Sequence, residues 1–392
     1  MSIGPAATSA GKLLPDAPAI PSGGVLLHVG VHKTGTTAIQ AALADARGDL
    51  TELGVSYPGK AQAQHRAALA ILQRTWGWNQ RGGSVVDRSQ FDELAAQVAK
   101  AKGRVVISSE FFCEADAEKC VDVVKNLGGD RVQVLVTLRN LGRLLPSSWQ
   151  QYLKYGLTKG YEPWLEDVFA KSSTSNMSPT FWRRHDHGAV LTRWAEAVGP
   201  KNVTVLILED VDRNAMFRSF AQLLGVPTGI FTSRMDLTSN RSMTAAEAEL
   251  LVRLNARVKM QMQWSEYVRL VRRGVAMALV EGREPAVDEP RLHTPDWALD
   301  AAMAHGLQDR AVISALGVNI LGDLDALGVR AGSPPPVVGT DSIPIDAAVQ
   351  ALVAVIQEAH DAPSTKELAK ALAKQARAGA KSRFTRKRSS AS

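Results

Sequence analysis

The first part of the chain alternates short apolar runs with longer stretches of helical periodicity. The clearest apolar runs are residues 25–30 (VLLHVG), 104–108 (RVVIS), 132–138 (VQVLVTL) and 203–208 (VTVLIL), and a weaker run lies at 54–58. Helical patterns lie between and after them at 36–46, 91–102, 115–127, 144–155, 188–197 and 214–224. Near-continuous apolar strands separated by helices predict an α/β fold with a buried parallel sheet and helices on both faces.

The pattern changes after about residue 235, where helical periodicity dominates. Further helices are expected at 244–257, 267–279, 346–359 and 365–378, with a Gly-Ser-Pro-Pro-Pro break at 332–336. We therefore predict a flexible N-terminus over 1–23, an α/β core over 24–235, a helical C-terminal region over 236–373 and a basic disordered tail over 374–392.

The net charge of +7 comes from that tail. Seven lysine and arginine residues and no acidic residue follow Ala373, so the rest of the chain is neutral. A solvated, disordered end explains these spread charges without a partner. A weak contact with nucleic acid or an acidic surface is the alternative.

Cysteine content and hydropathy indicate a cytoplasmic protein. Cys113 and Cys120 are the two cysteines, and they form neither a C-x-x-C pair nor a Cys/His cluster, so no zinc or redox motif is predicted. The N-terminal residues lack a signal-peptide pattern, and no apolar run reaches the length of a transmembrane helix. The sequence does not indicate an oligomeric state.

The first apolar run leads into a glycine loop that reads GVHKTGTT over residues 30–37. A strand, such a loop and a helix N-terminus form an anion site of the P-loop type, because free N–H groups and the helix dipole favour negative charge. A triphosphate-binding loop reads G-x-x-x-x-G-K-[ST]. Here Gly30 and Gly35 have that separation, but Thr36 replaces the lysine and Lys33 lies inside the loop. Lys33 is placed to neutralise a bridging oxygen as a bond breaks, without a metal.

The motif HKTGTT resembles the K-[ST]-G-T-T loop of sulfotransferases that use 3′-phosphoadenosine 5′-phosphosulfate. In that family the loop holds the 5′-phosphosulfate, and its lysine assists departure of the phosphate from the sulfuryl group. The resemblance gives Lys33 that catalytic role. It implies donor contacts by the loop residues Gly30, His32, Thr34, Gly35, Thr36 and Thr37.

A second motif follows the run 132–138. The family binds the donor's 3′-phosphate with an arginine at the end of a later strand and a serine eight residues on, and Arg139 and Ser147 match these positions. The aromatic residue that follows G-T-T in cytosolic relatives is Ala38 here, so the chain is more similar to the bacterial branch. Asn240 and Arg241 lie where some relatives place a further donor contact.

The predicted general base is Glu110, which follows the run 104–108. Strand carboxyl ends line the ligand crevice of a parallel sheet, and relatives carry their base at such a position. We expect Phe111 and Phe112 to raise its pKa by desolvation. His32, His65 and His185 are rivals, whereas His28 within the first run is expected in the core.

The resemblance implies sulfuryl transfer from 3′-phosphoadenosine 5′-phosphosulfate to a hydroxyl or amine of a small molecule, glycan or lipid. The tryptophan-rich stretches 75–79 and 179–184 are expected to build the acceptor pocket. Alternatives are a P-loop kinase or phosphotransferase, and a non-catalytic relative that binds donor or nucleic acid.

Overall fold

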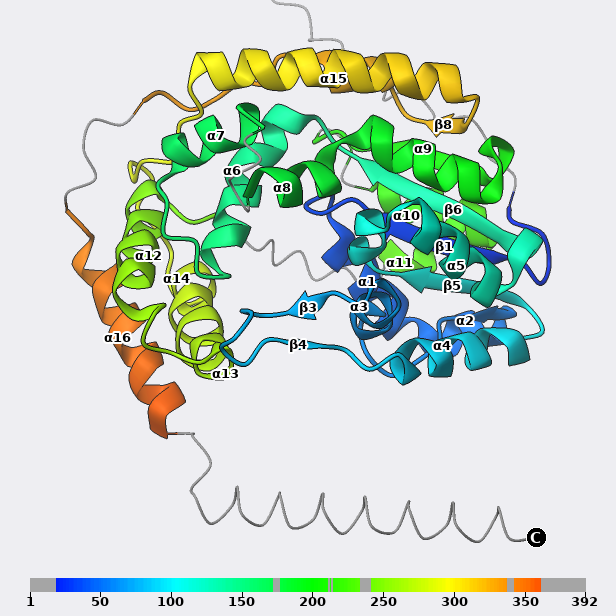
Figure 1. Ribbon diagram of the computed structural model, residues 1–392, viewed down its shortest axis with the longest axis horizontal. Coiled ribbons are helices and arrows are strands. Elements are labelled where there is room, and N and C mark those ends of the chain that lie inside the picture. The colour runs from blue at the N-terminus through cyan, green and yellow to red at the C-terminus, as the bar shows by residue number, and fades with distance from the viewer. Residues whose placement is uncertain are drawn as a thin grey trace, which may run out of the picture.

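The fold is built on a six-stranded parallel sheet (Figure 1). The computed structural model describes residues 19–171, 177–210, 212, 214–232, 241–336 and 342–360. In spatial order the strands are β2 (Val55–Ser56), β5 (Arg104–Ser108), β1 (Val25–Gly30), β6 (Val132–Leu138), β7 (Val203–Ile207) and β8 (Asn319–Leu321). The predicted α/β class with a parallel sheet is confirmed, and each predicted apolar run contains a strand.

Helices cover both faces of the sheet because its strands are apolar on both sides. In β1, Val25, Leu27 and Val29 enter one core, whereas Leu26 belongs to the other. The first core is completed by α3 (His65–Leu72), α4 (Ser89–Lys100), α5 (Ala117–Leu127) and α9 (His187–Val198). The second is completed by α1 (Thr36–Asp45), α2 (Arg47–Glu52), α10 (Ala215–Leu224) and α11 (Gly229–Thr232).

The chain joins this core earlier than predicted. Ile20 lies within the segment expected to be flexible, yet its side chain is fully buried and its N–H donates to the carbonyl of Leu223 at 2.8 Å. Residues 1–18 lie outside the described part of the chain.

The C-terminal part is mainly helical, but it also contributes to the sheet. Strand β8 pairs in parallel with β7, and the long helix α15 (Asp296–Leu316) packs on α9 and runs across the top of Figure 1. Neither element was predicted. The boundary near residue 235 therefore marks a change in composition, and the division into separate domains stays a prediction.

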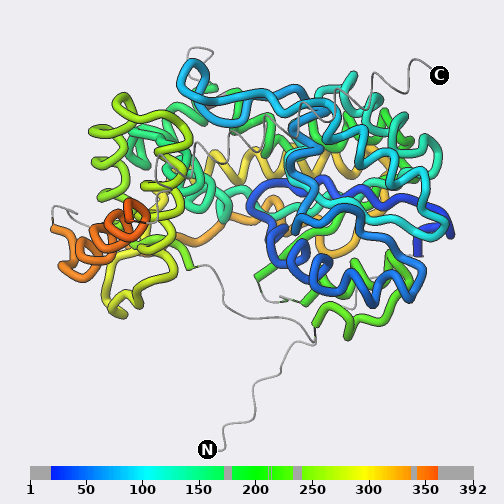
Figure 2. The backbone as a smooth tube through the Cα atoms, turned by 90° about the horizontal axis from the view of Figure 1, so that it is seen from below, coloured from blue at the N-terminus to red at the C-terminus, as the bar shows by residue number. Residues whose placement is uncertain are grey.

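A second group of helices lies beside the α/β part (Figure 2). It shares an apolar core and consists of α6 (Leu141–Leu153), α7 (Tyr161–Phe169), α8 (Met177–His185), α12 (Ala245–Val258), α13 (Trp264–Tyr267), the π-helix η4 (Val268–Val275) and α14 (Ala276–Glu281). The single helix predicted over 267–279 is thus divided between three elements. Thr244 caps α12 in a capping box with Glu247, as its sequence position suggests.

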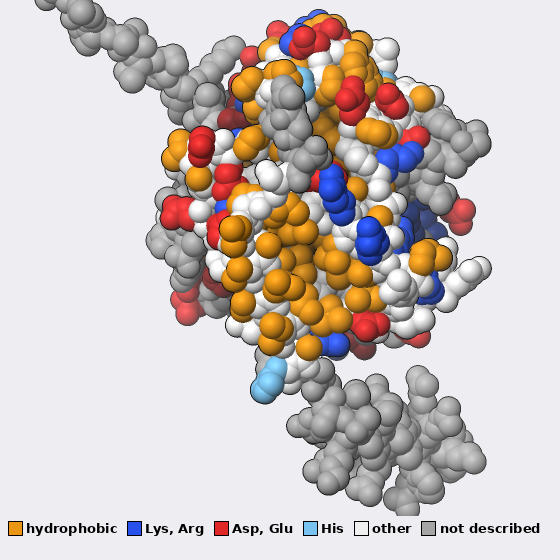
Figure 3. Space-filling view, turned by 90° about the vertical axis from the view of Figure 1, so that its left-hand side faces the viewer, with side chains coloured by type: hydrophobic (Ala, Val, Ile, Leu, Met, Phe, Trp, Pro, Cys, Tyr) orange, Lys and Arg blue, Asp and Glu red, His pale blue; other side chains and the backbone are white. Residues whose placement is uncertain are grey.

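The last described helix, α16 (Ile345–His360), packs on η4 and α14. Its residues Ala347, Ala351 and Ala354 are buried, and exposed apolar side chains gather on the outer face of this region (Figure 3). On α16 these are Ile345, Val349, Leu352, Val353 and Ile356.

A two-stranded arm links the two parts. Strands β3 (Thr75–Trp76) and β4 (Ser84–Val85) pair antiparallel and extend from α3 and α4 toward α13 (Figure 1). The far end of the arm is hydrogen-bonded to α13, because the N–H of Trp264 donates to the carbonyl of Arg81 at 2.8 Å.

Candidate functional site

The loop after β1 adopts a conformation that only certain residues tolerate. Gly30 and Gly35 have φ angles of 81° and 74°, and Lys33 lies in the same left-handed region at 68°. A lysine is rarely held there, and strained non-glycine residues concentrate at functional sites. The register of β1 with β6 also shifts between His28 and Gly30, just before the loop.

Thr137, near the end of β6, holds this loop in place. Its carbonyl accepts from the N–H of Val31 at 2.8 Å, and its hydroxyl lies 2.7 Å from that of Thr34. Thr34 also donates to the carbonyl of Val31 at 2.7 Å. The loop is therefore fixed beside the strand that leads to Arg139.

Helix α1 begins directly after the loop, at Thr36. Within the described part of the chain no side chain caps its first turn, so its N-terminal amides remain available to an anion. Thr36 is buried whereas Thr37 is exposed. The strand, loop and helix thus follow one another as expected, and anion binding by the loop stays a prediction.

Lys33 is in an unusual electrostatic setting. Burial and the neighbouring charge of Lys154 lower its pKa to about 8, and Glu110 opposes this shift. The ammonium group is thus mostly charged at neutral pH, and it loses its proton far more readily than an ordinary lysine.

Glu110 lies against Gly30 of the loop. The predicted rise of its pKa is wrong, because the pKa is lowered. Burial does raise the pKa of Glu110, yet His65, His32 and the amide of Gln40 together outweigh it, so that the pKa is lowered. Gln40 Nε2 donates to its carboxylate at 3.1 Å, and His65 Nδ1 lies 3.8 Å from Oε2. Glu110 is therefore ionised at neutral pH and able to accept a proton.

The histidines divide by environment. His28 is in the core as expected, hydrogen-bonded to Ser108 at 2.8 Å, and burial lowers its pKa to about 4. His185 is also buried, and burial holds its pKa well below the ordinary range. His65 is partly exposed, and its ring nitrogen lies 2.9 Å from the hydroxyl of Ser109. Of these three, His65 alone combines exposure with a position beside Glu110.

His32 leads to a cluster that the sequence did not reveal. Its Nε2 lies 3.2 Å from the carboxylate of Glu114, which is buried and also binds Arg74 and, at 2.9 Å, Arg184 Nε. Burial raises the pKa of Glu114, but Arg184, His32 and Arg74 hold it well below its usual range. Glu114 and its three partners come from four separate stretches of the chain, so no local pattern indicated the cluster.

Arg139 follows β6 at the carboxyl edge of the sheet, as predicted. Its guanidinium forms an ion pair with Asp210, which Arg143 shares. The Ser147 hydroxyl donates to the carbonyl of Leu144 at 3.0 Å, within its own helix. Asp210 therefore competes with any other anion for the Arg139 guanidinium.

Arg241 has a structural partner. It makes a two-point ion pair with the buried Glu247, at 2.7 and 2.8 Å, and Arg283 joins the same carboxylate. Its donor contact stays a prediction. Asn240 and the basic tail lie outside the described residues.

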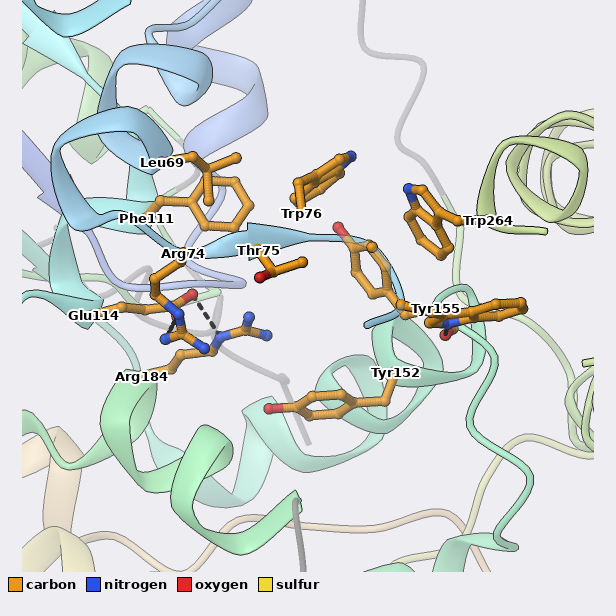
Figure 4. A pocket seen from close by; sticks show the side chains of 12 residues that line it. Leu69, Arg74, Thr75, Trp76, Phe111, Glu114, Tyr152, Tyr155, Arg184 and Trp264 are labelled. Carbon is orange, nitrogen blue, oxygen red and sulfur yellow. Dashed lines mark hydrogen bonds and ion pairs between the residues drawn. The ribbon is translucent and has the colours of Figure 1, made fainter. Parts of the chain in front are cut away.

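A cavity of about 170 Å³ lies next to this site (Figure 4). Its walls come from the arm (residues 75–78), η1 (Glu110–Glu114), the end of α6, α8 and α13. Both tryptophans of the stretch 75–79 line it, and Arg184 does so from the stretch 179–184.

Among the described residues there is no group of three metal-ligating side chains, and no helix is long and apolar enough to cross a membrane.

Comparison with known proteins gives one structural similarity. No protein-family model and no curated protein matches the chain. The crystal structure of a sulfotransferase from Alicyclobacillus acidocaldarius is similar over 62% of this chain and 97% of that chain, with 17% identity and a TM-score of 0.39. Similarity at this level does not assign a function.

Proposed function

We propose that the protein is a sulfotransferase that uses 3′-phosphoadenosine 5′-phosphosulfate and a hydroxyl or amine acceptor. One observation carries the proposal: Thr137 fixes the Lys33 loop beside the end of β6, two residues before Arg139. A loop for one phosphate and a cation for a second phosphate thus share one edge of the sheet, which suits a ligand with two separated phosphates.

Each donor contact has a physical basis. The amides at the start of α1 and the hydroxyls of Thr36 and Thr37 would bind the 5′-phosphate, because a helix N-terminus favours an anion. Arg139 would bind the 3′-phosphate, with Ser147 beside it. The other loop residues, Gly30, His32, Thr34 and Gly35, shape this cradle.

The transfer step needs a base and a stabilised leaving group. Glu110 takes the proton of the acceptor as the acceptor oxygen or nitrogen forms its bond to sulfur. The bond between sulfur and the bridging oxygen breaks, and its electron pair stays on the departing phosphate, where Lys33 neutralises the developing charge. The products are the sulfated acceptor and adenosine 3′,5′-bisphosphate. Glu110 suits this role because it is ionised and lies against the loop.

Calorimetric titration tests the donor assignment. Adenosine 3′,5′-bisphosphate should bind, and Lys33→Ala should weaken that binding about tenfold or more, as expected for loss of a buried charged contact. Lys60→Ala, at an exposed position, is the matched control. Tight binding of ATP with Mg²⁺ and none of the bisphosphate would refute the proposal and favour a kinase.

A further inference from the structure

The cavity in Figure 4 has flat, fixed walls. The Trp76 ring stands edge-on to Phe111 and to Tyr155, with ring centres 5.6 Å apart in both pairs. The Tyr155 and Trp264 rings are nearly parallel, at an angle of 14°. Rings held in this way present flat apolar faces that match another ring, either aromatic or sugar.

Close backbone packing keeps these rings in place. Trp78 Nε1 donates to the carbonyl of Tyr155 at 2.9 Å. A Cβ atom on Gly77 would lie 2.5 Å from the Trp264 ring, and one on Gly156 would lie 2.6 Å from the Trp78 ring. The cavity is therefore formed before any ligand arrives, which lowers the entropic cost of binding.

The charge around the cavity is unbalanced. Glu114 is a single carboxylate between the guanidinium groups of Arg74 and Arg184. A third guanidinium, that of Arg272, lies over the rings of Tyr155 and Trp76, at 4.6 and 5.5 Å. In the described part of the chain no carboxylate forms an ion pair with Arg272, whose hydrogen bond is to the Tyr155 hydroxyl at 3.3 Å. Arg74, Arg184 and Glu114 line the cavity, and Arg272 contacts two of its aromatic walls, so three guanidinium groups lie around the one carboxylate of the lining.

The cavity adjoins the residues assigned to chemistry. Glu114 binds His32, which precedes Lys33, and Phe111 contacts the rings of both His32 and His65, with centres 5.2 Å apart in each pair. Phe111 also follows Glu110 directly. Phe111 and Glu114 line the cavity, so the proposed base is next in sequence to one of its walls.

We infer that this cavity is the acceptor site and that it selects a ring-bearing alcohol or phenol that carries a carboxylate or sulfate group. This inference rests on the proposed sulfotransferase function. The aromatic walls bind the ring, and the excess guanidinium charge, centred on Arg272, binds the anionic group. The hydroxyl then meets Glu110.

Two matched acceptor pairs test the inference with labelled donor. One compares 4-hydroxyphenylacetate with 4-methylphenol, and the other compares methyl β-glucuronide with methyl β-glucoside. The anionic member of at least one pair should have a kcat/KM at least tenfold higher, and the pair that responds distinguishes an aryl from a sugar acceptor. Equal rates, or faster transfer to the neutral members, overturn the inference.

The Arg272→Gln variant tests whether Arg272 causes the preference for anionic acceptors. It should reduce the ratio of anionic to neutral kcat/KM about tenfold, with binding of adenosine 3′,5′-bisphosphate unchanged. Arg273→Gln removes the same charge from an exposed neighbouring position and should leave the ratio unchanged. An unchanged ratio in Arg272→Gln overturns the role of that residue.

Binding of adenosine 3′,5′-bisphosphate distinguishes failure of the acceptor inference from failure of the proposed function. If the bisphosphate binds but neither pair accepts sulfate, the acceptor assignment is wrong and the donor assignment stands. If the bisphosphate does not bind, the proposed function fails, and the acceptor inference fails with it.

Discussion

A Cβ atom on Gly30 would lie 2.7 Å from the Cβ of Glu110 and 2.8 Å from its Cα. The first glycine of the loop and the proposed base are therefore in direct contact, across the neighbouring strands β1 and β5. Because Gly30 also has a φ of 81°, both the space and the conformation require glycine.

We expect Gly30→Ala to displace Glu110 and to lower the transfer rate about a hundredfold, since small misplacements of a reacting group are costly. The free energy of unfolding should fall by about 2 kcal/mol or more because of the left-handed φ and the clash. Urea denaturation and single-turnover transfer check both effects. Gly48→Ala is the control: it lies in α2 with open space around it, and it should be neutral or slightly stabilising.

The pKa of Lys33 predicts the pH dependence of donor binding. Because the free protein loses this proton near pH 8, affinity for adenosine 3′,5′-bisphosphate should fall about fivefold from pH 8 to pH 9. In Lys33→Arg the cation persists across this range, so the decline should disappear. An equal decline in both proteins would show that another group titrates.

The ion pair of Arg139 with Asp210 should oppose donor binding. Asp210→Asn removes the competing carboxylate, so the bisphosphate should bind severalfold more tightly at low salt, and the gain should shrink as salt is added. Asp212→Asn removes the same charge from a carboxylate that pairs with Arg218, and it should have little effect. Weaker binding in Asp210→Asn would mean that Asp210 positions Arg139.

Glu114 should contribute strongly to stability. Glu114→Gln leaves two guanidinium groups without their shared anion, and we expect a loss of about 3 kcal/mol at pH 7. Because the folded-state pKa is depressed, this stabilisation exists above the unfolded-state pKa and is lost as pH falls below about 4.5. The unfolding curves of wild type and Glu114→Gln should therefore converge in acid. Glu118→Gln, an exposed change nearby, should differ little from wild type at any pH.

The basic tail should not contribute to donor binding. Deletion of residues 374–392 removes seven positive charges, but every proposed donor contact precedes it in the sequence. Calorimetry should give the same bisphosphate affinity with and without the tail. A large loss of affinity in a folded, shortened protein would contradict the placement of the donor site.

Local patterns made much of this structure predictable. The strands are continuous apolar runs, and the loop from Gly30 to Thr37 carries its conformation in its own glycines, so both could be inferred from short stretches. Helix α15 was missed because its buried positions are mostly small or polar, such as Ala298, Gly306 and Asp309. These residues give little periodic signal.

Long-range relationships could not be predicted. Glu114 meets Arg74 and Arg184, which are 40 and 70 residues away, and only the folded topology brings them together. The same holds for the pKa of Glu110, where two neighbouring phenylalanines suggested a rise. Its polar partners lie on α1, α3 and the loop, and they reverse that direction.

The position of Trp76 and Trp78 on the arm affects how the cavity can change in evolution. The anion-binding loop is one uninterrupted stretch, whereas the cavity needs the arm, the end of α6 and Trp264 to match one another in shape. If residues 75–85 alone were transferred into a homologue, Trp76 and Trp78 would lack Gly156 and Trp264, against which the arm packs. If the cavity binds the acceptor as inferred, a change of acceptor preference between homologues requires at least three segments to be inherited together, while the loop can be inherited alone.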